Sequence, residues 1–454
     1  MAIDLTTTYA GVSLKNFLIA ASGPPTHDPE TCERNAKAGF GAVVLKTGRT
    51  DIPESRMCKV GSPMVKLLDP TARQQWKPVP PKKSAAKILG KRGKIRPDYS
   101  ASYIFQTSPH YYNEDPDYID FYTETYKRCE PYNCKVIPSI YAGSWSGWER
   151  QIKMINKMQP KPIAVELNTS CPVTAVITEI AGLKTGMCIA AEPEIFEQVV
   201  KFCVDRLDVP AVPKLIPYES RNPFLALAAD RAGAKGVNLG NASAVPSLTI
   251  NVEDATVGEE PTHPTFSLAG WGAWIIPVNC YSIWSMRKNN LQVDIAATGG
   301  VREPEDVIKY IMAGANAVEI CSAIWVEGFS VGTRLLDSIA AFMEKKGYKS
   351  IKDMRGNIVN KVVTDLSKFE QRVPLKKGGT LPPNVVVLDE RKCIDCGWCE
   401  AGCMFLAIEI VDGVPKFDQE KCETCSMCIE LCPVGALSIS PREANNVYHS
   451  KGGE

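Results

Sequence analysis

Several patterns that would direct a protein to a membrane, to secretion or to nucleic acid are missing from the sequence. None of its apolar runs reaches eighteen residues, so no transmembrane helix is expected. The first residues, MAIDLTTTYAG, lack the basic segment followed by an apolar segment that marks a signal peptide. The formal net charge is only +1, so no overall electrostatic field would attract nucleic acid or a membrane surface. We therefore expect a soluble cytoplasmic protein that binds neither.

A dinucleotide-binding fingerprint is also missing. No G-x-G-x-x-G follows a predicted strand, and GWGAW at residues 270–274 lacks both the third glycine and the strand–turn–helix context. The chain is therefore expected to have no nicotinamide-binding domain of its own. If it transfers electrons, it must exchange them with a partner protein.

Cysteine, by contrast, is abundant: the chain has 17, and two short segments near the C-terminus are especially rich in it. Residues 393–403 read CIDCGWCEAGC and residues 422–433 read CETCSMCIELCP, so each contains a C-x2-C-x2-C-x3-C run. In a cytoplasmic protein of this length, clustered cysteines indicate metal binding before disulfides.

This spacing is typical of bacterial ferredoxins with two [4Fe–4S] clusters, in which the fourth cysteine of each run ligates the other cluster. A pair of zinc sites is the alternative, which the duplicated run disfavours because tetrahedral zinc sites have no crossed ligand. Such a domain transfers electrons, so another part of the chain must donate or accept them. The expected ligands are Cys393, Cys396, Cys399 and Cys432 for one cluster, and Cys422, Cys425, Cys428 and Cys403 for the other.

Upstream of the cysteine runs, short apolar runs alternate with amphipathic segments. Near-continuous apolar runs are typical of strands buried on both faces. Eight such strands separated by helices predict an α/β fold, a (β/α)8 TIM barrel, rather than a doubly wound sheet. The expected strands lie in residues 17–23, 42–48, 135–143, 163–170, 212–217, 236–242, 293–300 and 317–323, and the expected helices in 28–39, 147–158, 192–207, 220–232, 303–313 and 328–346.

The chain is therefore expected to contain a catalytic barrel in residues 1–348, a linker in 349–384 that includes the segment PLKKGGTLPP, and a small α+β ferredoxin-like domain with a tail in 385–454. In TIM barrels the active site forms at the carboxyl ends of the strands. Most of those predicted ends carry polar residues or glycine here, so we expect the active site there.

Two of these strand ends suggest a phosphate site. ATGGV (297–301) follows the seventh predicted strand and EICSA (319–323) ends the eighth, which places small residues where barrels usually bind a phosphate through backbone N–H groups. Considered alone, the Gly-Gly pair is explained more simply as a tight turn. Beside a ferredoxin domain a phosphate-bearing redox cofactor is favoured, and FMN fits because it takes electrons singly from clusters and passes on a hydride.

The motifs together resemble a known family. ELNTSCP (166–172), LKTG (45–48), ATGGV and EICSA, on a predicted barrel followed by a two-cluster ferredoxin, are similar to the FMN domain and C-terminal part of dihydropyrimidine dehydrogenase. They are also similar to the small FMN-and-cluster subunit of its bacterial two-subunit form. Dihydroorotate dehydrogenases share the barrel and the N-x-S-C-P loop more distantly. The resemblance covers nearly the whole chain.

The resemblance implies roles for individual residues. Cys171 would be the general acid/base, with Ser170 beside it, because a thiol suits proton exchange next to a carbonyl; a buried structural cysteine is the alternative. Asn168, Asn241 and Ala242 would line the substrate site, where an amide can donate to and accept from an imide-like ring. The residues expected to bind FMN are Ala21, Ser22, Lys46, Thr47, Asn168, Lys214, Asn238, Gly299, Gly300, Cys321, Ser322 and Ala323.

The activity implied is reduction or formation of an activated C=C bond of a pyrimidine-like ring, by hydride transfer from flavin N5 and protonation by Cys171. Val173 and Ala242 stand where pyrimidine-specific relatives carry polar residues, which leaves open another activated alkene such as an acyl-coenzyme A. A non-catalytic electron-transfer subunit is a further alternative. The expected partner is an NAD(P)H-oxidising flavoprotein subunit or another electron carrier, in a homodimer or hetero-oligomer.

A basic segment remains outside these assignments. Residues 82–96, KKSAAKILGKRGKIR, carry seven basic residues and no acidic one. The segment is either a solvated excursion over the barrel mouth or a lid that binds an anionic substrate or an acidic electron carrier.

Overall fold

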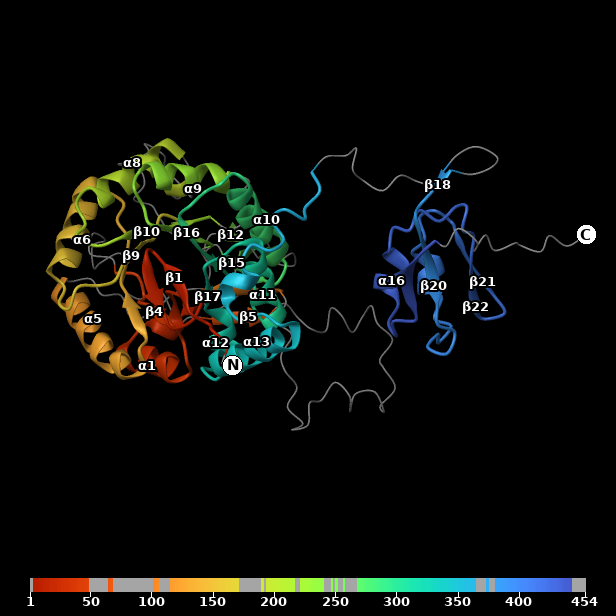
Figure 1. Cartoon of the computed structure of the whole chain (residues 1–454), viewed down its shortest axis with the longest axis horizontal. Coiled ribbons are helices and arrows are strands. Elements are labelled where there is room, and N and C mark those ends of the chain that lie inside the picture. Colours follow the sequence, from red (N-terminus) through yellow and green to blue (C-terminus); the bar gives the residue numbers. More distant parts are fainter. Residues whose placement is uncertain are drawn as a thin grey trace, which may run out of the picture. The chain divides into compact units, whose positions relative to one another are not determined.

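The chain forms two units in the computed structural model, one that ends at Val362 and one that begins at Val363 (Figure 1). The domain limits drawn from the sequence, including the linker over 349–384, remain a prediction. The structure describes residues 3–48, 64–67, 101–105, 115–170, 189–191, 193–216, 221–240, 246–247, 250–251, 256–257, 268–364, 373–374 and 380–442.

The eight apolar runs of the first unit form parallel strands that pair side by side in the order β7-β4-β3-β17-β16-β11-β10-β9-β8. β7 and β8 are two parts of one strand, interrupted at Pro138, which has no N–H to donate to the ladder. The sheet therefore closes on itself, and the predicted TIM barrel is confirmed. The strands are β3 (Leu18–Ala20), β4 (Ala42–Val44), β7 (Lys135–Ile137) with β8 (Ser139–Ile140), β9 (Val165–Leu167), β10 (Ala211–Leu215), β11 (Gly236–Leu239), β16 (Asp294–Thr298) and β17 (Ala317–Ile320).

Helices form a ring outside the strands (Figure 1). Local signals explain where several of them begin: α1 starts with Pro29 after Asp28, whose side chain accepts a hydrogen bond from the Thr31 N–H at 2.8 Å. Six helices fall on the expected ranges: α1 (Pro29–Lys37), α6 (Trp145–Lys157), α8 (Pro193–Val204), α9 (Asn222–Arg231), α11 (Pro304–Ala313) and α13 (Val331–Lys346).

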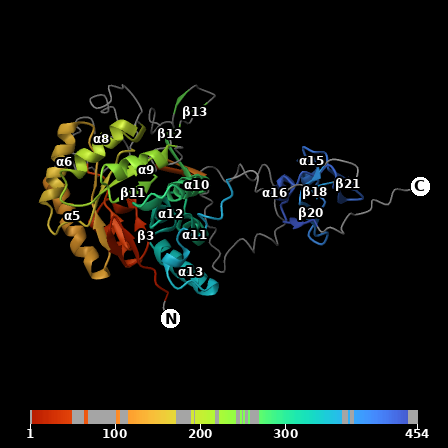
Figure 2. The same cartoon turned by 45° about the horizontal axis from the view of Figure 1, so that its top comes forward.

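Other helices were not expected from the sequence. α5 (Asp115–Cys129) follows a long insertion that hid it, and α10 (Ile275–Lys288) begins in WGAWIIP, where Pro277 falls in the first helical turn and is tolerated. The short helices α12 (Ser322–Glu327) and α14 (Ile351–Met354) follow β17 and α13. Figure 2 shows α5 and α6 side by side at the outer wall of the barrel.

Successive side chains of each strand point alternately into the barrel and outward toward the helices. Apolar side chains fill the interior near the strands' amino ends, including Ile19, Val44 and Val212, and the hairpin of β1 (Thr7–Tyr9) and β2 (Val12–Leu14) covers that end with Tyr9. The outward side chains pack against the helices in a second, larger core. Because both faces are buried, the strands read as near-continuous apolar runs in the sequence.

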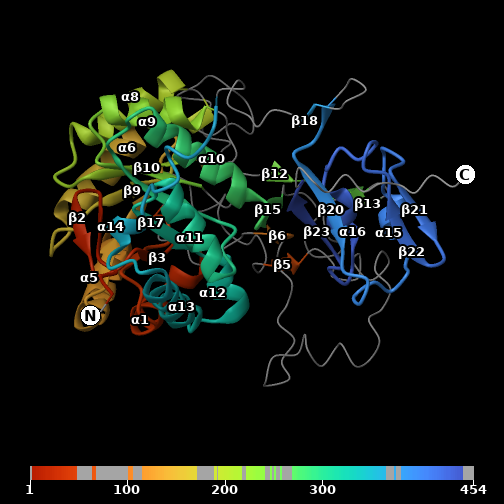
Figure 3. The ribbon, with the colours of Figure 1, turned by 45° about the vertical axis from the view of Figure 1, so that its right-hand side comes forward.

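Two excursions from the barrel meet in a four-stranded antiparallel sheet of order β12-β15-β6-β5. β5 (Met64–Leu67) and β6 (Ala101–Phe105) follow the carboxyl end of β4, whereas β12 (Pro246–Ser247) and β15 (Leu268–Gly272) follow that of β11 (Figure 3). A separate hairpin pairs β13 (Ile250–Asn251) with β14 (Thr256–Val257). The basic segment 82–96 lies outside the described residues.

The second unit is built from two small, two-stranded antiparallel sheets. β20 (Asn384–Leu388) pairs with β23 (Leu437–Pro441), and β21 (Ile408–Val411) pairs with β22 (Val414–Phe417). The third cysteine of each triplet lies in a one-turn helix, Cys399 in α15 (Trp398–Ala401) and Cys428 in α16 (Met427–Leu431). A further short hairpin, β18 (Val373–Pro374) with β19 (Thr380–Leu381), precedes these elements. No described helix of either unit is long and apolar enough to cross a membrane.

Candidate functional site

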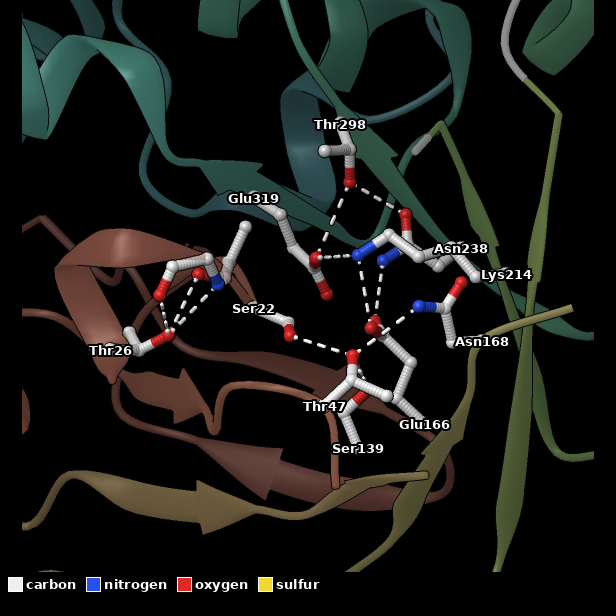
Figure 4. Close-up of polar contacts among 12 residues, drawn as sticks. Ser22, Thr26, Thr47, Ser139, Glu166, Asn168, Lys214, Asn238, Thr298 and Glu319 are labelled. Carbon is white, nitrogen blue, oxygen red and sulfur yellow. Dashed lines mark hydrogen bonds and ion pairs between the residues drawn. The ribbon is translucent and has the colours of Figure 1, made fainter. Parts of the chain in front are cut away.

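Hydroxyl and amide side chains from four neighbouring strand ends form one polar group (Figure 4). Thr47 Oγ1 lies 3.2 Å from Ser22 Oγ and 3.0 Å from Ser139 Oγ, and Asn168 Nδ2 donates to Thr47 Oγ1 at 3.3 Å. The hydroxyl of Tyr118 on α5 donates to the backbone carbonyl of Ser139 at 2.8 Å and so holds this strand in place. The structure therefore brings together Ser22, Thr47 and Asn168, which the sequence predicted, with Ser139, which it did not.

A second polar group lies in the barrel interior and is built from five consecutive strands of the sheet. Lys214 Nζ lies 2.9 Å from Glu166 Oε1 and 3.4 Å from Glu319 Oε2. Asn238 Nδ2 donates to Glu166 Oε2 at 2.7 Å, and Thr298 Oγ1 lies 2.6 Å from Asn238 Oδ1 and 3.3 Å from Glu319 Oε2 (Figure 4). The predicted residues Lys214 and Asn238 are thus tied to two buried carboxyl groups.

Burial and mutual charge control this second group. Burial alone would lower the pKa of Lys214, but the charges of Glu166 and Glu319 outweigh it and raise that pKa above its usual value. Burial and then the charge of Glu166 raise the pKa of Glu319 to about 7. Lys214 is 3% exposed, so it is a buried, permanently charged lysine at the carboxyl end of β10. Such a cation can stabilise negative charge on a ligand bound at the strand ends.

The ends of β3, β4 and β17 also meet. A Cβ on Gly23 would come within 2.6 Å of Cys321 Sγ, so glycine is needed where the end of β3 meets the end of β17. Burial raises the pKa of Cys321 to about 12, although Lys46 and Lys214 lie near enough for their charges to oppose the shift. Cys321 is therefore a neutral, packed thiol, while Lys46 and Lys214 place two cations at one end of the barrel.

The predicted phosphate position is a tight turn that requires glycine. Gly299 and Gly300 have φ angles of +102° and +76°, which favour glycine, and a Cβ on Gly300 would lie 2.9 Å from the Gly272 carbonyl oxygen. The Tyr310 hydroxyl donates to the Gly299 carbonyl at 2.9 Å and holds the turn. The strand ends thus combine two cations, amide side chains and a turn without side chains. These groups fit FMN, which has a polar ring edge and a phosphate.

The loop that carries the predicted acid/base begins at Ser170. Ser170 is fully buried, and its hydroxyl has no hydrogen-bond partner among the described residues. The neighbouring Thr169 hydroxyl donates to the Lys214 backbone carbonyl at 2.7 Å, which fixes the end of β9 against β10. Cys171, Asn241 and Ala242 lie outside the described residues, so their roles stay predictions.

Four residues of these groups were missed in the sequence: Ser139, Glu166, Thr298 and Glu319. All lie on strands at positions where the alternation turns side chains into the barrel, as Figure 4 shows. The signal was present, because Glu166 and Glu319 each interrupt an otherwise apolar run, VEL and AVEI. A charged residue inside a doubly buried strand is costly and therefore indicates a paired, functional group.

The eight cysteines of the second unit line two separate cavities. The first is lined by Cys393, Cys396, Cys399 and Cys432. The second is lined by Cys403, Cys422, Cys425 and Cys428. Each cavity thus combines three cysteines of one run with the fourth of the other, which is the crossed arrangement expected for cluster ligands.

The two cysteine runs also fold alike. Asp395 and Thr424, at matching positions, have φ angles of +53° and +52°, and the next matching pair, Gly397 and Ser426, has +72° and +68°. The backbone N–H of Ala407 donates to Cys403 Sγ at 3.3 Å, and that of Ala436 donates to Cys432 Sγ at 3.2 Å. In the described part of the chain no three His, Cys, Asp or Glu side chains are arranged for a metal ion. The crossed lining of the two cavities and the matching backbone of the two runs fit iron–sulfur clusters better than zinc.

Comparison with known proteins agrees with this geometry. Residues 113–343 match the family model for dihydroorotate dehydrogenase, and residues 384–436 match the model for a 4Fe-4S dicluster domain. Fold and site together define an oxidoreductase with a TIM barrel and an iron–sulfur ferredoxin domain. The chain belongs to the dihydroorotate dehydrogenase family, whose members bind FMN.

Individual relatives cover most of the barrel. The catalytic subunit of dihydroorotate dehydrogenase B (NAD(+)) from Pyrococcus abyssi is 26% identical over 348 residues, which are 76% of this chain and 96% of that protein. The same subunit from Pyrococcus furiosus is 27% identical, with the same coverage. A crystal structure of the Eimeria tenella enzyme, DHODH in complex with ferulenol, aligns with a TM-score of 0.54 at 16% identity and covers 78% of this chain and 88% of that one, which shows the shared fold.

Proposed function

We propose that the protein is an FMN- and iron–sulfur-dependent oxidoreductase that reduces or forms an activated C=C bond in a pyrimidine-like ring. The observation that carries this proposal is a barrel whose carboxyl end presents Lys46, Lys214 and Asn168, in one chain with two cavities of four cysteines each. The pyrimidine assignment draws support from the dihydroorotate-oxidising relatives named above. The comparisons support dihydroorotate dehydrogenase, which the sequence analysis ranked as the more distant resemblance, and not dihydropyrimidine dehydrogenase. A dihydropyrimidine substrate therefore stays only a part of this proposal.

The residues that would hold FMN divide by the part of the cofactor they suit. Lys46 and Lys214 would face the electron-rich edge of the ring, and the turn at Gly299 and Gly300 would receive the phosphate. Bound FMN would supply hydride transfer at N5 and single-electron exchange with iron–sulfur clusters. The full proposed set is Ala21, Ser22, Lys46, Thr47, Asn168, Lys214, Asn238, Gly299, Gly300, Cys321, Ser322 and Ala323.

The protein's own residues would orient the substrate and move one proton. The side-chain amides of Asn168 and Asn241 would bind ring carbonyl and N–H groups, because an amide both donates and accepts. The Cys171 thiol would hold at Sγ the proton that is added to, or removed from, the carbon beside a carbonyl. Ser170 would orient that loop. The reverse reaction uses the same groups with the proton returned to Cys171.

Electrons would enter or leave through two [4Fe–4S] clusters in the second unit. Their partner would be a separate electron-transfer protein, such as an NAD(P)H-oxidising flavoprotein subunit. The relatives support such a partner because their names describe them as catalytic subunits.

The proposal is tested on the full chain purified without oxygen. Iron, sulfide and FMN are quantified, and the dithionite-reduced protein is mixed with uracil, thymine, orotate or crotonyl-coenzyme A while flavin absorbance is followed. Rapid reoxidation by a pyrimidine and not by the thioester supports the proposal. Reoxidation only by crotonyl-coenzyme A assigns the same machinery to another alkene, and protein that binds iron but rejects added FMN contradicts a flavin enzyme altogether.

A further inference from the structure

We infer that the Glu319 carboxyl is protonated inside the barrel, and that this proton makes Glu319 a positioning residue that balances the charge of Lys214 beneath the ligand site. The protonation follows from the geometry of the barrel alone. Its effect on a bound flavin rests on the function proposed above.

The hydrogen bonds around Asn238 decide where one proton lies. Asn238 Nδ2 donates to Glu166 Oε2 at 2.7 Å, so Asn238 Oδ1 must accept from its other neighbour, Thr298 Oγ1, at 2.6 Å. The opposite amide orientation would point Oδ1 at a carboxylate and is excluded. The single hydroxyl proton of Thr298 is therefore directed at Asn238.

The contact between Thr298 and Glu319 then requires a second proton. Thr298 Oγ1 lies 3.3 Å from Glu319 Oε2, and its own proton is already given to Asn238. If Glu319 were ionised, no proton would lie between these two oxygens, and Oε2 would accept only from Lys214 Nζ, at the longer distance of 3.4 Å. With the proton on Glu319 Oε2, the carboxyl O–H donates to the Thr298 hydroxyl and completes a chain through Asn238 to Glu166.

The charge count points the same way. Glu166 accepts from Lys214 and from Asn238, so it is a carboxylate, and Lys214 is nearer to it, at 2.9 Å, than to Glu319, at 3.4 Å. Two carboxylates with one cation would leave a net buried negative charge, which is costly. A protonated Glu319 makes the Glu166–Lys214–Glu319 group neutral overall.

Of the described neighbours, Lys214 is the cation whose charge lowers the pKa of Glu319. Tyr9, from β1 below, is fully buried and has a pKa raised well above its usual value, by burial first and then by Glu319 and Glu166. Cys321 is a neutral thiol, and Asp294 on β16 adds only negative charge. The charge of Lys46, which follows β4, lowers the pKa of Cys321. Glu319 Oε1 has no hydrogen-bond partner among the described residues, which costs less for a neutral carbonyl oxygen than for a carboxylate.

Neutral Glu319 affects any ligand charge above it. Lys214 is paired with one carboxylate instead of two, so more of its field reaches the strand ends. By reciprocity, negative charge at the ligand site strengthens proton binding by Glu319. A bound flavin that gains negative charge on reduction would therefore have a midpoint potential that depends on this proton.

The proton is tested by infrared spectroscopy of the full-length protein. Glu319→Gln keeps the size of the side chain but cannot titrate, and Glu327→Gln, a partly buried glutamate paired with Arg334, is the matched control. At pH 6 the spectrum of the wild type minus that of E319Q should show the C=O stretch of a protonated carboxylic acid. The band should survive in E327Q and disappear as the pH is raised above 7. A difference spectrum at pH 6 without such a band overturns the inference.

Glu166→Gln provides an independent measurement if E319Q does not fold. Removal of the Glu166 charge leaves Lys214 with Glu319 as its only carboxylate, so Glu319 should ionise and the acid band should be lost at pH 6. Persistence of the band in E166Q contradicts the proposed balance of charge.

Spectroelectrochemistry of bound flavin separates this inference from the proposed function. Above neutral pH the wild-type flavin potential should fall more steeply with pH than that of E319Q, whereas E327Q should follow the wild type. Parallel curves for the wild type and E319Q overturn the role beneath the ligand. Protein that shows the infrared band but binds no FMN refutes the proposed function and leaves the protonated carboxyl established.

Discussion

The two functional regions of this chain are encoded in opposite ways. In the ferredoxin-like unit, each cavity takes three cysteines from one short run, Cys393 to Cys399 or Cys422 to Cys428, and one from the other run. In the barrel, Lys214 and Glu319 are in contact although they are 105 positions apart in the chain. Local spacing can therefore reveal a cluster ligand, whereas a barrel network is visible only once the strands are placed in order.

The largest expected effect comes from substituting a cysteine that lies in one run but lines the cavity of the other. Cys432→Ser should remove the cluster of the first cavity and leave the second, because Cys432 is the crossed ligand there. Bound iron should fall by about half, and Cys403→Ser should remove the other cluster instead. Iron analysis and electron paramagnetic resonance measure this, with Cys280→Ser, outside both cavities, as the control. Loss of both clusters or of neither in each variant would refute crossed ligation.

In the barrel, the largest expected effect comes from the proposed proton donor. Cys171→Ala should keep bound flavin and reduce turnover by roughly 100- to 10,000-fold, the usual contribution of a positioned acid or base. Single-turnover reoxidation of reduced protein by substrate measures it. Cys203→Ala, in the buried face of α8, is the control for loss of a thiol alone. Turnover at the wild-type rate in C171A would remove this residue from the mechanism.

The barrel network can be tested by removing its cation. Lys214→Met should destabilise the barrel by about 3–5 kcal/mol, because it leaves buried carboxyl groups without their partner. The double variant Lys214→Met with Glu166→Gln should recover part of this loss, since it removes the uncompensated charge. Denaturant unfolding measures both. Equal stability of K214M and the wild type would show that the lysine is not paired as described.

A smaller effect concerns pH. The pKa of Glu319 is raised to about 7 from its usual value of 4.5, so between these values the folded protein binds a proton that the unfolded chain has lost. Wild-type stability should therefore decrease, relative to Glu319→Gln, as the pH rises from about 4.5 to 7 and then level off. At about 1.4 kcal/mol per pKa unit, the total change is about 3 kcal/mol. Denaturant unfolding at several pH values measures this change. If Glu319 did not hold the proton, the unfolding free energies of the two proteins would change with pH in parallel.

The smallest effect distinguishes the two cysteine runs from each other. Ser426 has a φ of +68° at the position where the first run has Gly397, so Ser426→Gly should stabilise the ferredoxin-like unit by about 1 kcal/mol. Gly397→Ser should destabilise it by a similar amount. Thermal unfolding of the cluster-loaded protein measures both, and a destabilising S426G would show that the serine side chain contributes more than its backbone strain costs.

Sequence patterns predicted much of the fold because strands buried on both faces form near-continuous apolar runs in the sequence. All eight barrel strands coincide with predicted runs, and six helices fall on predicted ranges. α5 was missed because a long insertion separates it from the preceding strand, and α10 because Pro277 was not recognised as part of a first turn. Lys214 and Asn168 were predicted as strand-end residues, but Glu166 and Glu319 were passed over inside apolar runs.

By itself, the amino-acid sequence determined the barrel class and the cysteine runs, because strand burial and cluster ligation act over a few neighbouring residues. Tertiary structure alone decided which residues meet inside the barrel. Alternate side chains of each strand point into the barrel, and the sheet closes on itself. Glu166, Lys214 and Glu319 meet for these two reasons. Whether a buried carboxyl keeps its proton depends on those neighbours, since electrostatic free energy is set by distance in space and not by distance along the chain.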